Sequence, residues 1–197
     1  MSGSRTLLNV YLVIFFAYMF LPLILMMAAG FNEFSPPSVT VWRGFTWRWF
    51  GVLADDARMW QGLFNSLLIA AGVIVISLPV GLAGALVLTR VESRYNSLLY
   101  AIMVSPILTP GIILGISTLV FWREGGVVGG LFTAAVAQTT YISSYAMLLF
   151  IARLERQDLA LAEAAFDLGA THAQVFRRIT LPFLMPTIAT AAVIAFL

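Results

Sequence analysis

Side chains that could carry chemistry are scarce in this chain of 197 residues. It contains nine carboxylates, eleven basic residues that are all Arg, one His and no Cys. Without Lys it can form neither a complete P-loop nor a Schiff base, and without Cys it has no thiolate nucleophile or metal ligand. A single His cannot build an H-E-x-x-H zinc site. The sequence therefore predicts no catalytic residue, no metal site and no cofactor.

The charged residues gather in the segment 153–181, which holds eight of the twenty. Within it, Glu163 and Asp167 lie one helical turn apart and so share a helix face. These carboxylates can pair with a basic group on another subunit or with a local Arg such as Arg156; a solvated helix face is the alternative. The Arg residues are spread along the chain rather than clustered, which predicts no nucleic-acid interface.

The elements that position these residues must lie in a membrane. Of all residues, 61% are hydrophobic and 10% are charged, whereas soluble domains carry about 25% charge. Five charge-free runs come close to or exceed the roughly 20 residues with which a helix crosses a bilayer. Because they are apolar throughout and do not alternate as strands would, we expect an all-α integral membrane protein, a polytopic helical bundle. The expected spans are residues 7–30, 63–89, 97–122, 131–152 and 182–197.

The Arg residues in the short loops orient these spans. With the N-terminus in the cytoplasm, seven Arg lie inside and four outside, which is the bias that the positive-inside rule favours. This orientation places the loop 31–61 outside and the segment 153–181 in the cytoplasm. The outer loop is rich in aromatic residues between Trp42 and Phe50. They suit a short helix lying at the membrane interface or, alternatively, part of a docking surface for an external partner.

The third span contains residues that break or thin a helix. Pro106 and Pro110 remove backbone donors, and Gly111 and Gly115 have the GxxxG spacing that lets helices approach closely. Membrane helices tolerate such breaks where a neighbouring helix or cavity water takes up the freed carbonyls. Close helix packing and a role in a solute pathway or its gate are both open interpretations of these four residues.

Local rules predict a helix, a corner and a second helix within residues 153–181. Gly169 follows an apolar pattern of helical period, at the place where a helix end takes a left-handed residue. Thr171 and Gln174 have the spacing of a capping box. Pro182 fits the first turn of the last span, where its missing N–H is not needed.

The same segment carries a longer motif: E-A-A, three residues, G, nine residues, then I-x-L-P. This chain has Glu163-Ala164-Ala165, Gly169 and Ile179-Thr180-Leu181-Pro182 at those spacings. In this it resembles the inner-membrane permease subunits of type I binding-protein-dependent ABC importers. Asn65-Ser66-Leu67, Ser105-Pro106 and Pro110-Gly111 are similar to the spermidine/putrescine permease group.

The resemblance implies a division of labour among subunits. A periplasmic or extracellular solute-binding protein captures the solute, this chain and a second permease subunit, homologous or identical, form the pathway, and a cytoplasmic ABC ATPase dimer hydrolyses ATP. The chain itself would not be an enzyme, and it would lie among lipid in the inner (plasma) membrane. The residues implied to couple it to the ATPase are Glu163, Ala164, Ala165, Asp167, Gly169, Ile179, Leu181 and Pro182.

Two further expectations follow from the resemblance. The family core has six spans and this sequence ends in the fifth, so we expect a C-terminal continuation after Leu197. The solute is expected to be a polyamine such as spermidine or putrescine, or a similar small organic solute.

The alternatives are an ion channel or secondary carrier subunit, and an importer for amino acids, iron or anions. Channels and carriers usually place ionisable groups at membrane depth, and the expected spans contain none.

Overall fold

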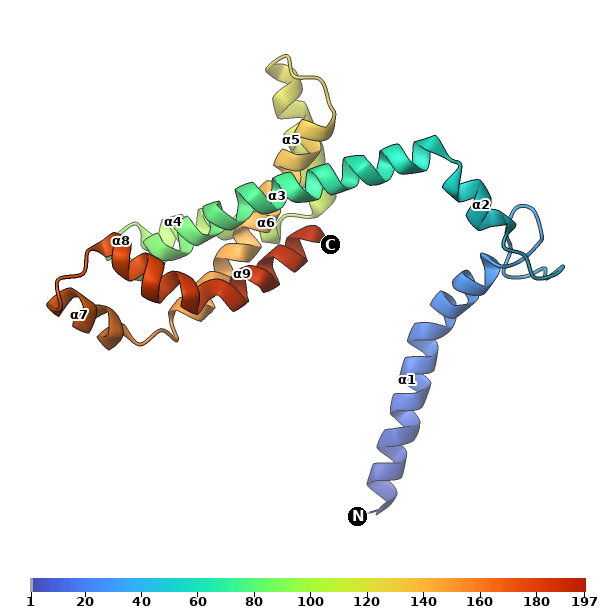
Figure 1. Cartoon of the computed structure of the whole chain (residues 1–197), viewed down its shortest axis with the longest axis horizontal. Coiled ribbons are helices and arrows are strands. Elements are labelled where there is room, and N and C mark those ends of the chain that lie inside the picture. The colour runs from blue at the N-terminus through green and yellow to red at the C-terminus, as the bar shows by residue number, and fades with distance from the viewer. Residues whose placement is uncertain (1) are drawn as a thin grey trace. The chain divides into compact units, whose positions relative to one another are not determined.

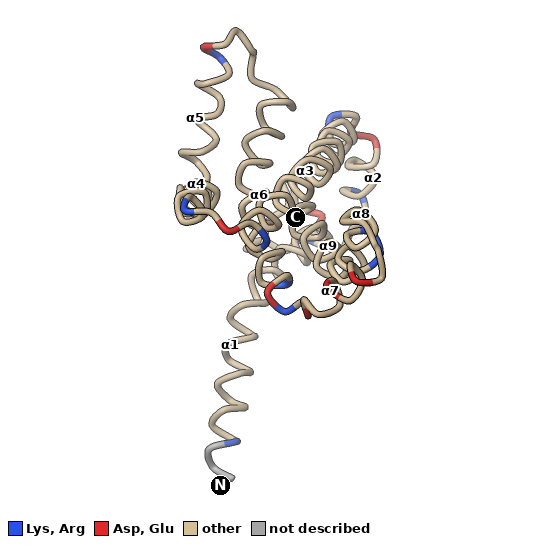
Figure 2. The backbone as a smooth tube through the Cα atoms, turned by 90° about the vertical axis from the view of Figure 1, so that its left-hand side faces the viewer, with Lys and Arg blue, Asp and Glu red and all other residues tan. Residues whose placement is uncertain are grey.

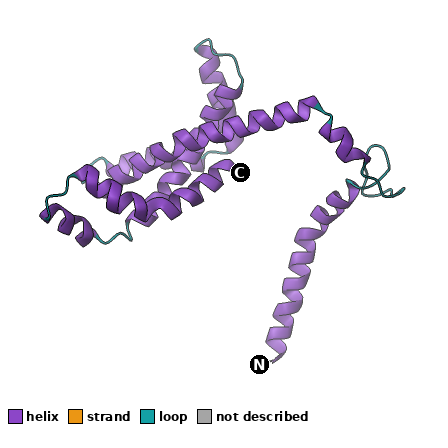
Figure 3. Ribbon diagram, viewed as in Figure 1, coloured by secondary structure: helices purple, strands orange, loops and turns teal. Residues whose placement is uncertain are grey.

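The computed structural model describes the backbone of residues 2–197 and the side chains of residues 5–197. Over this range the chain is helical, with one isolated antiparallel bridge between Asn32 and Phe45 and no strand (Figure 3). The all-α fold class expected from the sequence is confirmed. The helices are α1 Ser2–Ala29, α2 Arg48–Ala54, α3 Ala57–Arg90, α4 Asn96–Leu108, α5 Gly111–Glu124, α6 Leu131–Leu154, α7 Leu159–Asp167, α8 His172–Val175, the π-helix η1 Phe176–Thr180 and α9 Leu181–Phe196.

Four helices of the described chain are long and apolar enough to cross a membrane. They are Arg5–Ala29, Ala57–Arg90, Leu131–Leu154 and the continuous helix His172–Phe196 formed by α8, η1 and α9. In these four helices the charged residues lie near the ends, and the helix bodies between them are free of charge (Figure 2). This distribution keeps ionised groups out of hydrocarbon, where they are costly.

The stretch 97–122, which we expected to be one helix, is bent. Helices α4 and α5 meet at an angle of 105°, as a broken span or a re-entrant loop. The break lies at Thr109 and Pro110, because a proline disfavours the helical conformation of the residue before it. Thr109 is accordingly extended, with φ −91° and ψ 128°. Its hydroxyl donates to the Ser105 carbonyl over 2.9 Å, which satisfies one of the carbonyls at the end of α4.

The chain divides into two compact units, one extending to Gly62 and the other from Leu63 to Leu197. In the first unit, residues 30–47, here called the first connection, are built around the fully buried side chain of Asn32. Its amide nitrogen donates to the carbonyls of Ser38 and Val41, and its oxygen accepts from the N–H groups of Phe34 and Arg43. One polar side chain thus holds four other positions of this connection together.

In the second unit, α6 is the central helix and packs against α4, α5 and α9 (Figure 1). Its buried side chains include Met147 and Phe150, which share a core with residues of α3 and α9. Gly81 permits the close approach of α3 to α6, because a Cβ at this position would lie 2.8 Å from the Ser143 carbonyl oxygen. Association of membrane helices depends on such close packing, since lipid is as apolar as the helices themselves.

Candidate functional site

The segment 153–181 contains a helix, a tight corner and the start of the last membrane helix. Asp158 begins α7, because its carboxylate accepts from the N–H of Ala160 over 3.0 Å. At the other end, Gly169 has φ +82°, the left-handed conformation predicted from the sequence. The N–H of Gly169 bonds the Phe166 carbonyl at 2.9 Å and that of Ala170 bonds the Ala165 carbonyl at 3.0 Å. These two bonds form a Schellman motif, which ends α7 sharply.

The second arm of the corner starts at Thr171. The predicted capping box is confirmed: Gln174 N–H donates to the Thr171 hydroxyl at 3.3 Å, and Thr171 N–H donates to Oε1 of Gln174 at 2.8 Å. The rings of Phe166 and His172 meet edge-on across the corner with their centroids 4.8 Å apart. The angle between α7 and α8 is thus held by local bonds and by one ring contact.

Pro182 lies in the first turn of α9, as expected, but α9 continues α8 and η1 in one membrane helix. The helix runs through from His172, and Pro182 lies inside it, directly after the π-helix η1. Because Pro182 has no N–H to offer the carbonyl four residues back, the backbone widens by one residue before it. The N–H of Leu181 accordingly bonds the Phe176 carbonyl, five residues back.

Three of the motif residues meet at one hollow. Ala165, Gly169 and Ile179 line a cavity of about 440 Å³ on the inside of the corner. The other motif residues do not line it. Glu163, Ala164 and Asp167 are exposed on α7, Leu181 is half-buried, and Pro182 is exposed on the last helix.

Helix α7 presents apolar side chains that the described chain covers only in part. Leu159 and Leu161 are 51% and 58% exposed, and Leu168 at the corner is 89% exposed. Glu163 forms no ion pair with Arg156 or any other described residue. An exposed apolar surface beside free carboxylates is typical of a site that binds another protein.

The base of α7 is tied to two membrane helices. Gln157 is only 8% exposed; its Oε1 accepts from Nη2 of Arg90 at 2.6 Å, and its Nε2 donates to the Thr180 hydroxyl at 3.3 Å. Nearby, Nε of Arg153 donates to the Phe183 carbonyl at 3.2 Å, and its guanidinium lies 4.0 Å from the centroid of the Phe183 ring. Sequence reasoning missed Gln157, because its partners are 67 and 23 residues away.

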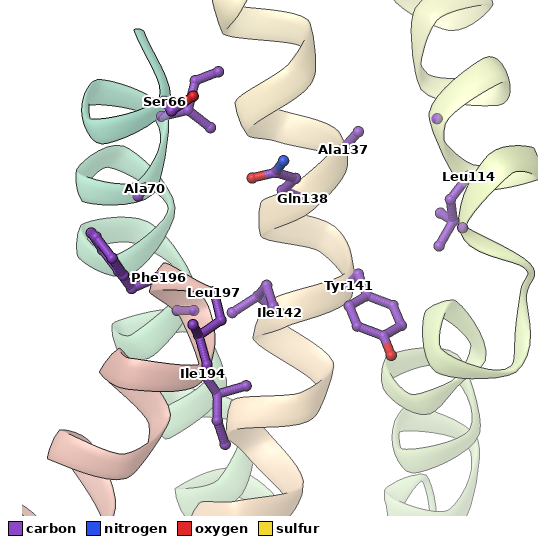
Figure 4. A pocket seen from close by; sticks show the side chains of 14 residues that line it. Ser66, Ala70, Leu114, Ala137, Gln138, Tyr141, Ile142, Ile194, Phe196 and Leu197 are labelled. Carbon is purple, nitrogen blue, oxygen red and sulfur yellow. The ribbon is translucent and has the colours of Figure 1, made fainter. Parts of the chain in front are cut away.

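A second hollow lies among α3, α5, α6 and α9, and Gly111 and Gly115 line it. Its volume is about 660 Å³, and its polar groups include Gln138 and Tyr141 of α6 (Figure 4). A Cβ at either glycine would meet no atom within 4 Å, so neither serves a close helix contact within this chain. The other two candidate pathway residues lie elsewhere. Pro106 lines a separate groove with Thr139 and Ser143, and Pro110 begins α5.

Comparison with known protein families identifies the family of this chain. Residues 77–197 match the family of binding-protein-dependent transport system inner membrane components. The match includes the segment 153–181 and all but the first part of α3 among the helices of the second unit. The chain belongs to this family.

Curated members of the family align with nearly the whole chain. The putrescine transport system permease protein PotI of Escherichia coli K12 is 34% identical over 194 residues, covering 95% of this chain and 68% of PotI. The spermidine/putrescine transport system permease protein PotC of the same strain is 27% identical over 193 residues, covering 98% of this chain and 72% of PotC.

Solved structures show the same fold. A bacterial ABC transporter that imports the acidic polysaccharide alginate aligns with a TM-score of 0.74 at 19% identity, over 98% of this chain and 73% of that chain. The inward-facing MetNI methionine ABC transporter aligns with a TM-score of 0.55 at 27% identity, over 70% of this chain and 65% of that chain.

Family membership fixes the general role. The chain is a multi-pass inner-membrane permease component of an ABC importer, and ATP hydrolysis belongs to a separate subunit of such systems. A binding-protein-dependent ABC system of this kind includes an ATPase and a solute-binding protein.

Proposed function

We propose that the segment 153–181 of this permease is cytoplasmic, docks on the ATPase subunit and couples ATP hydrolysis to a pathway for polyamines. The observation that carries the docking is the exposed apolar surface of α7 next to the rigid Gly169 corner. A partner that covers Leu161 and Leu168 would remove their apolar surface from water, which is the main favourable term in protein association. The excess of Arg at the cytoplasmic ends of the expected spans supports an N-terminus in the cytoplasm.

The motif residues divide the work of docking. Ala164 and Ala165 keep α7 thin, so that a partner surface can approach its backbone. Glu163 and Asp167, which have no partner among the described residues, offer two carboxylates to basic groups of the ATPase. Gly169 sets the angle between α7 and the helix that enters the membrane. Ile179 lies in the widened turn of that helix, and Leu181 and Pro182 follow this turn.

A second permease subunit completes the pathway. The membrane-spanning windows of α3, α6 and the last helix are only 33%, 28% and 22% buried within the chain. Lipid and a second permease, homologous or identical, would cover the remaining apolar surface. In this arrangement Gly111 and Gly115 leave room at the cavity among α3, α5, α6 and α9, and Pro106 and Pro110 permit the bend between α4 and α5.

The solute we propose is a polyamine such as putrescine or spermidine. The support is the identity of 34% to a putrescine permease, together with that of 27% to a spermidine/putrescine permease. The cavity among α3, α5, α6 and α9 offers neutral oxygens and an aromatic ring, from Ser66, Gln138 and Tyr141, and no charged side chain. Such groups attract an ammonium group but hold it weakly enough for release.

Reconstitution of the complete importer in proteoliposomes tests this function. Labelled putrescine should enter in an ATP-dependent and binding-protein-dependent manner, at least about tenfold faster than methionine at equal concentration. Faster uptake of methionine than of putrescine would contradict the substrate. Absence of stable association between the permease and the ATPase would contradict the docking.

A further inference from the structure

The base of α7 is joined to two other helices through one buried amide. Gln157 is 8% exposed, although its neighbours Arg156 and Asp158 are both exposed. It accepts from Arg90, the last residue of α3, and it donates to Thr180, in the π-turn before α9. It also lies directly before Asp158, the residue that begins α7.

We propose that Gln157 is a positioning residue that transmits displacement of α7 to α3 and α9 together. This inference rests on the proposed docking of α7 on the ATPase. A shift of the first turn of α7 must move Gln157, and the hydrogen bonds of Gln157 then pull on the ends of both helices. The lining of the cavity formed by Ser66 and Ala70 of α3 and by Ile194 and Ala195 of α9 would follow.

The chemistry of the amide suits this task. A glutamine side chain accepts through its oxygen and donates through its nitrogen, so it can hold a guanidinium and a hydroxyl at once. A leucine in its place could bond neither Arg90 nor Thr180, whereas a glutamate could still accept from both. Thr180 is itself only 8% exposed, so its hydroxyl has little access to water as a substitute partner.

The neighbouring contact of Arg153 does not duplicate this link. Arg153 joins the end of α6 to Phe183 of α9 and has no bond to α3. It can fix α9 against α6, but it cannot move α3 and α9 in step. Gln157 is therefore the side chain that joins the base of α7 to α3 and to the last helix at once.

The test measures putrescine uptake per ATP hydrolysed by the complete importer in proteoliposomes, together with ATPase binding. We expect Q157L to bind the ATPase and to hydrolyse ATP, while uptake per ATP falls about tenfold. T180V, which keeps the shape of the side chain and removes only the hydroxyl, should lower this ratio severalfold, and T180S should restore it. Q61L, at an exposed glutamine of α3, is the matched control and should keep the wild-type ratio.

Two results would overturn the inference while leaving the proposed function intact. The first is a wild-type ratio in both Q157L and T180V. The second is a parallel loss of uptake and hydrolysis with an unchanged ratio, which indicates a merely structural role. If the wild-type complex itself hydrolyses ATP without taking up putrescine, the proposed function fails, and this inference fails with it.

Discussion

Two connections of this permease are built in opposite ways. The first connection closes on itself: Asn32 makes four side-chain hydrogen bonds within it, and its backbone carbonyl accepts from the indole of Trp49 at 2.7 Å. In the segment 153–181, side-chain hydrogen bonds form only at the base of α7 and at the first turns of α7 and α8, and backbone hydrogen bonds close the corner at Gly169. Helix α7 between these points leaves its leucines uncovered.

The aromatic residues of the first connection show the same contrast. The rings of Phe31, Phe45 and Trp47, with Phe50 of α2, make five contacts with centroids 5.0 to 5.7 Å apart, although three of these rings are exposed. No such cluster forms on α7, where Phe166 contacts only His172 among the aromatic rings. A segment that satisfies its own groups can hold its shape alone, whereas α7 has surface left for a partner.

The largest effect should come from the corner of the segment 153–181. In G169V, a β-branched residue must adopt φ +82°, which costs about 1–3 kcal/mol and opens the Schellman motif. We expect uptake to fall at least about tenfold while membrane insertion is preserved. Proteoliposome uptake and the yield of inserted protein measure both effects.

Gly126, in the connection between α5 and α6, supplies the matched control for that substitution. It has φ +79°, and, as at Gly169, a Cβ there would meet no atom within 4 Å. G126V therefore introduces the same backbone strain away from the ATPase and should keep most of the uptake. Equal losses in G126V and G169V would show that strain alone, rather than the corner, is responsible.

A smaller and purely local effect is expected for the first connection. N32A leaves the N–H groups of Phe34 and Arg43 without their acceptor, at a cost of about 1–3 kcal/mol to the loop. Tryptic cleavage after Arg43 should become roughly tenfold faster, while ATPase binding stays at the wild-type level. T40A, which loses only an exposed hydroxyl contact, is the control. Loss of ATPase binding in N32A would contradict the claim that the segment 153–181, and not the first connection, docks on the ATPase.

The parts of this structure that follow from sequence are those governed by neighbouring residues. Gly169 and the Thr171–Gln174 capping box were predictable, because the partners in each bond lie within a few positions. The charge-free runs likewise predicted the membrane helices. Gln157 was not predictable, because its partners lie 67 and 23 residues away and only the fold brings them near. Asn32 was not predictable, because its side-chain partners, up to 11 residues away, lie in an irregular loop whose spacing follows no general rule.

The bend between α4 and α5 is an intermediate case. Pro106 lies within α4, where the Ser105 hydroxyl donates to the Ile102 carbonyl that Pro106 cannot bond. Pro110 ends the helix, four residues later. The sequence showed two prolines in one expected span, but which of them breaks the helix depends on packing and on side-chain hydrogen bonds.

Docking on the ATPase must cover α7, and one labelling experiment tests this coverage directly. Residues 1–197 contain no Cys, so L168C and V39C each add one thiol to this part of the permease, at positions 89% and 56% exposed in the wild type. Maleimide labelling of each full-length permease is measured with and without the ATPase subunit. If the ATPase covers α7, it should slow the labelling of L168C at least about tenfold and leave the labelling rate of V39C, in the first connection, unchanged. Equal labelling of L168C in both conditions would contradict this coverage.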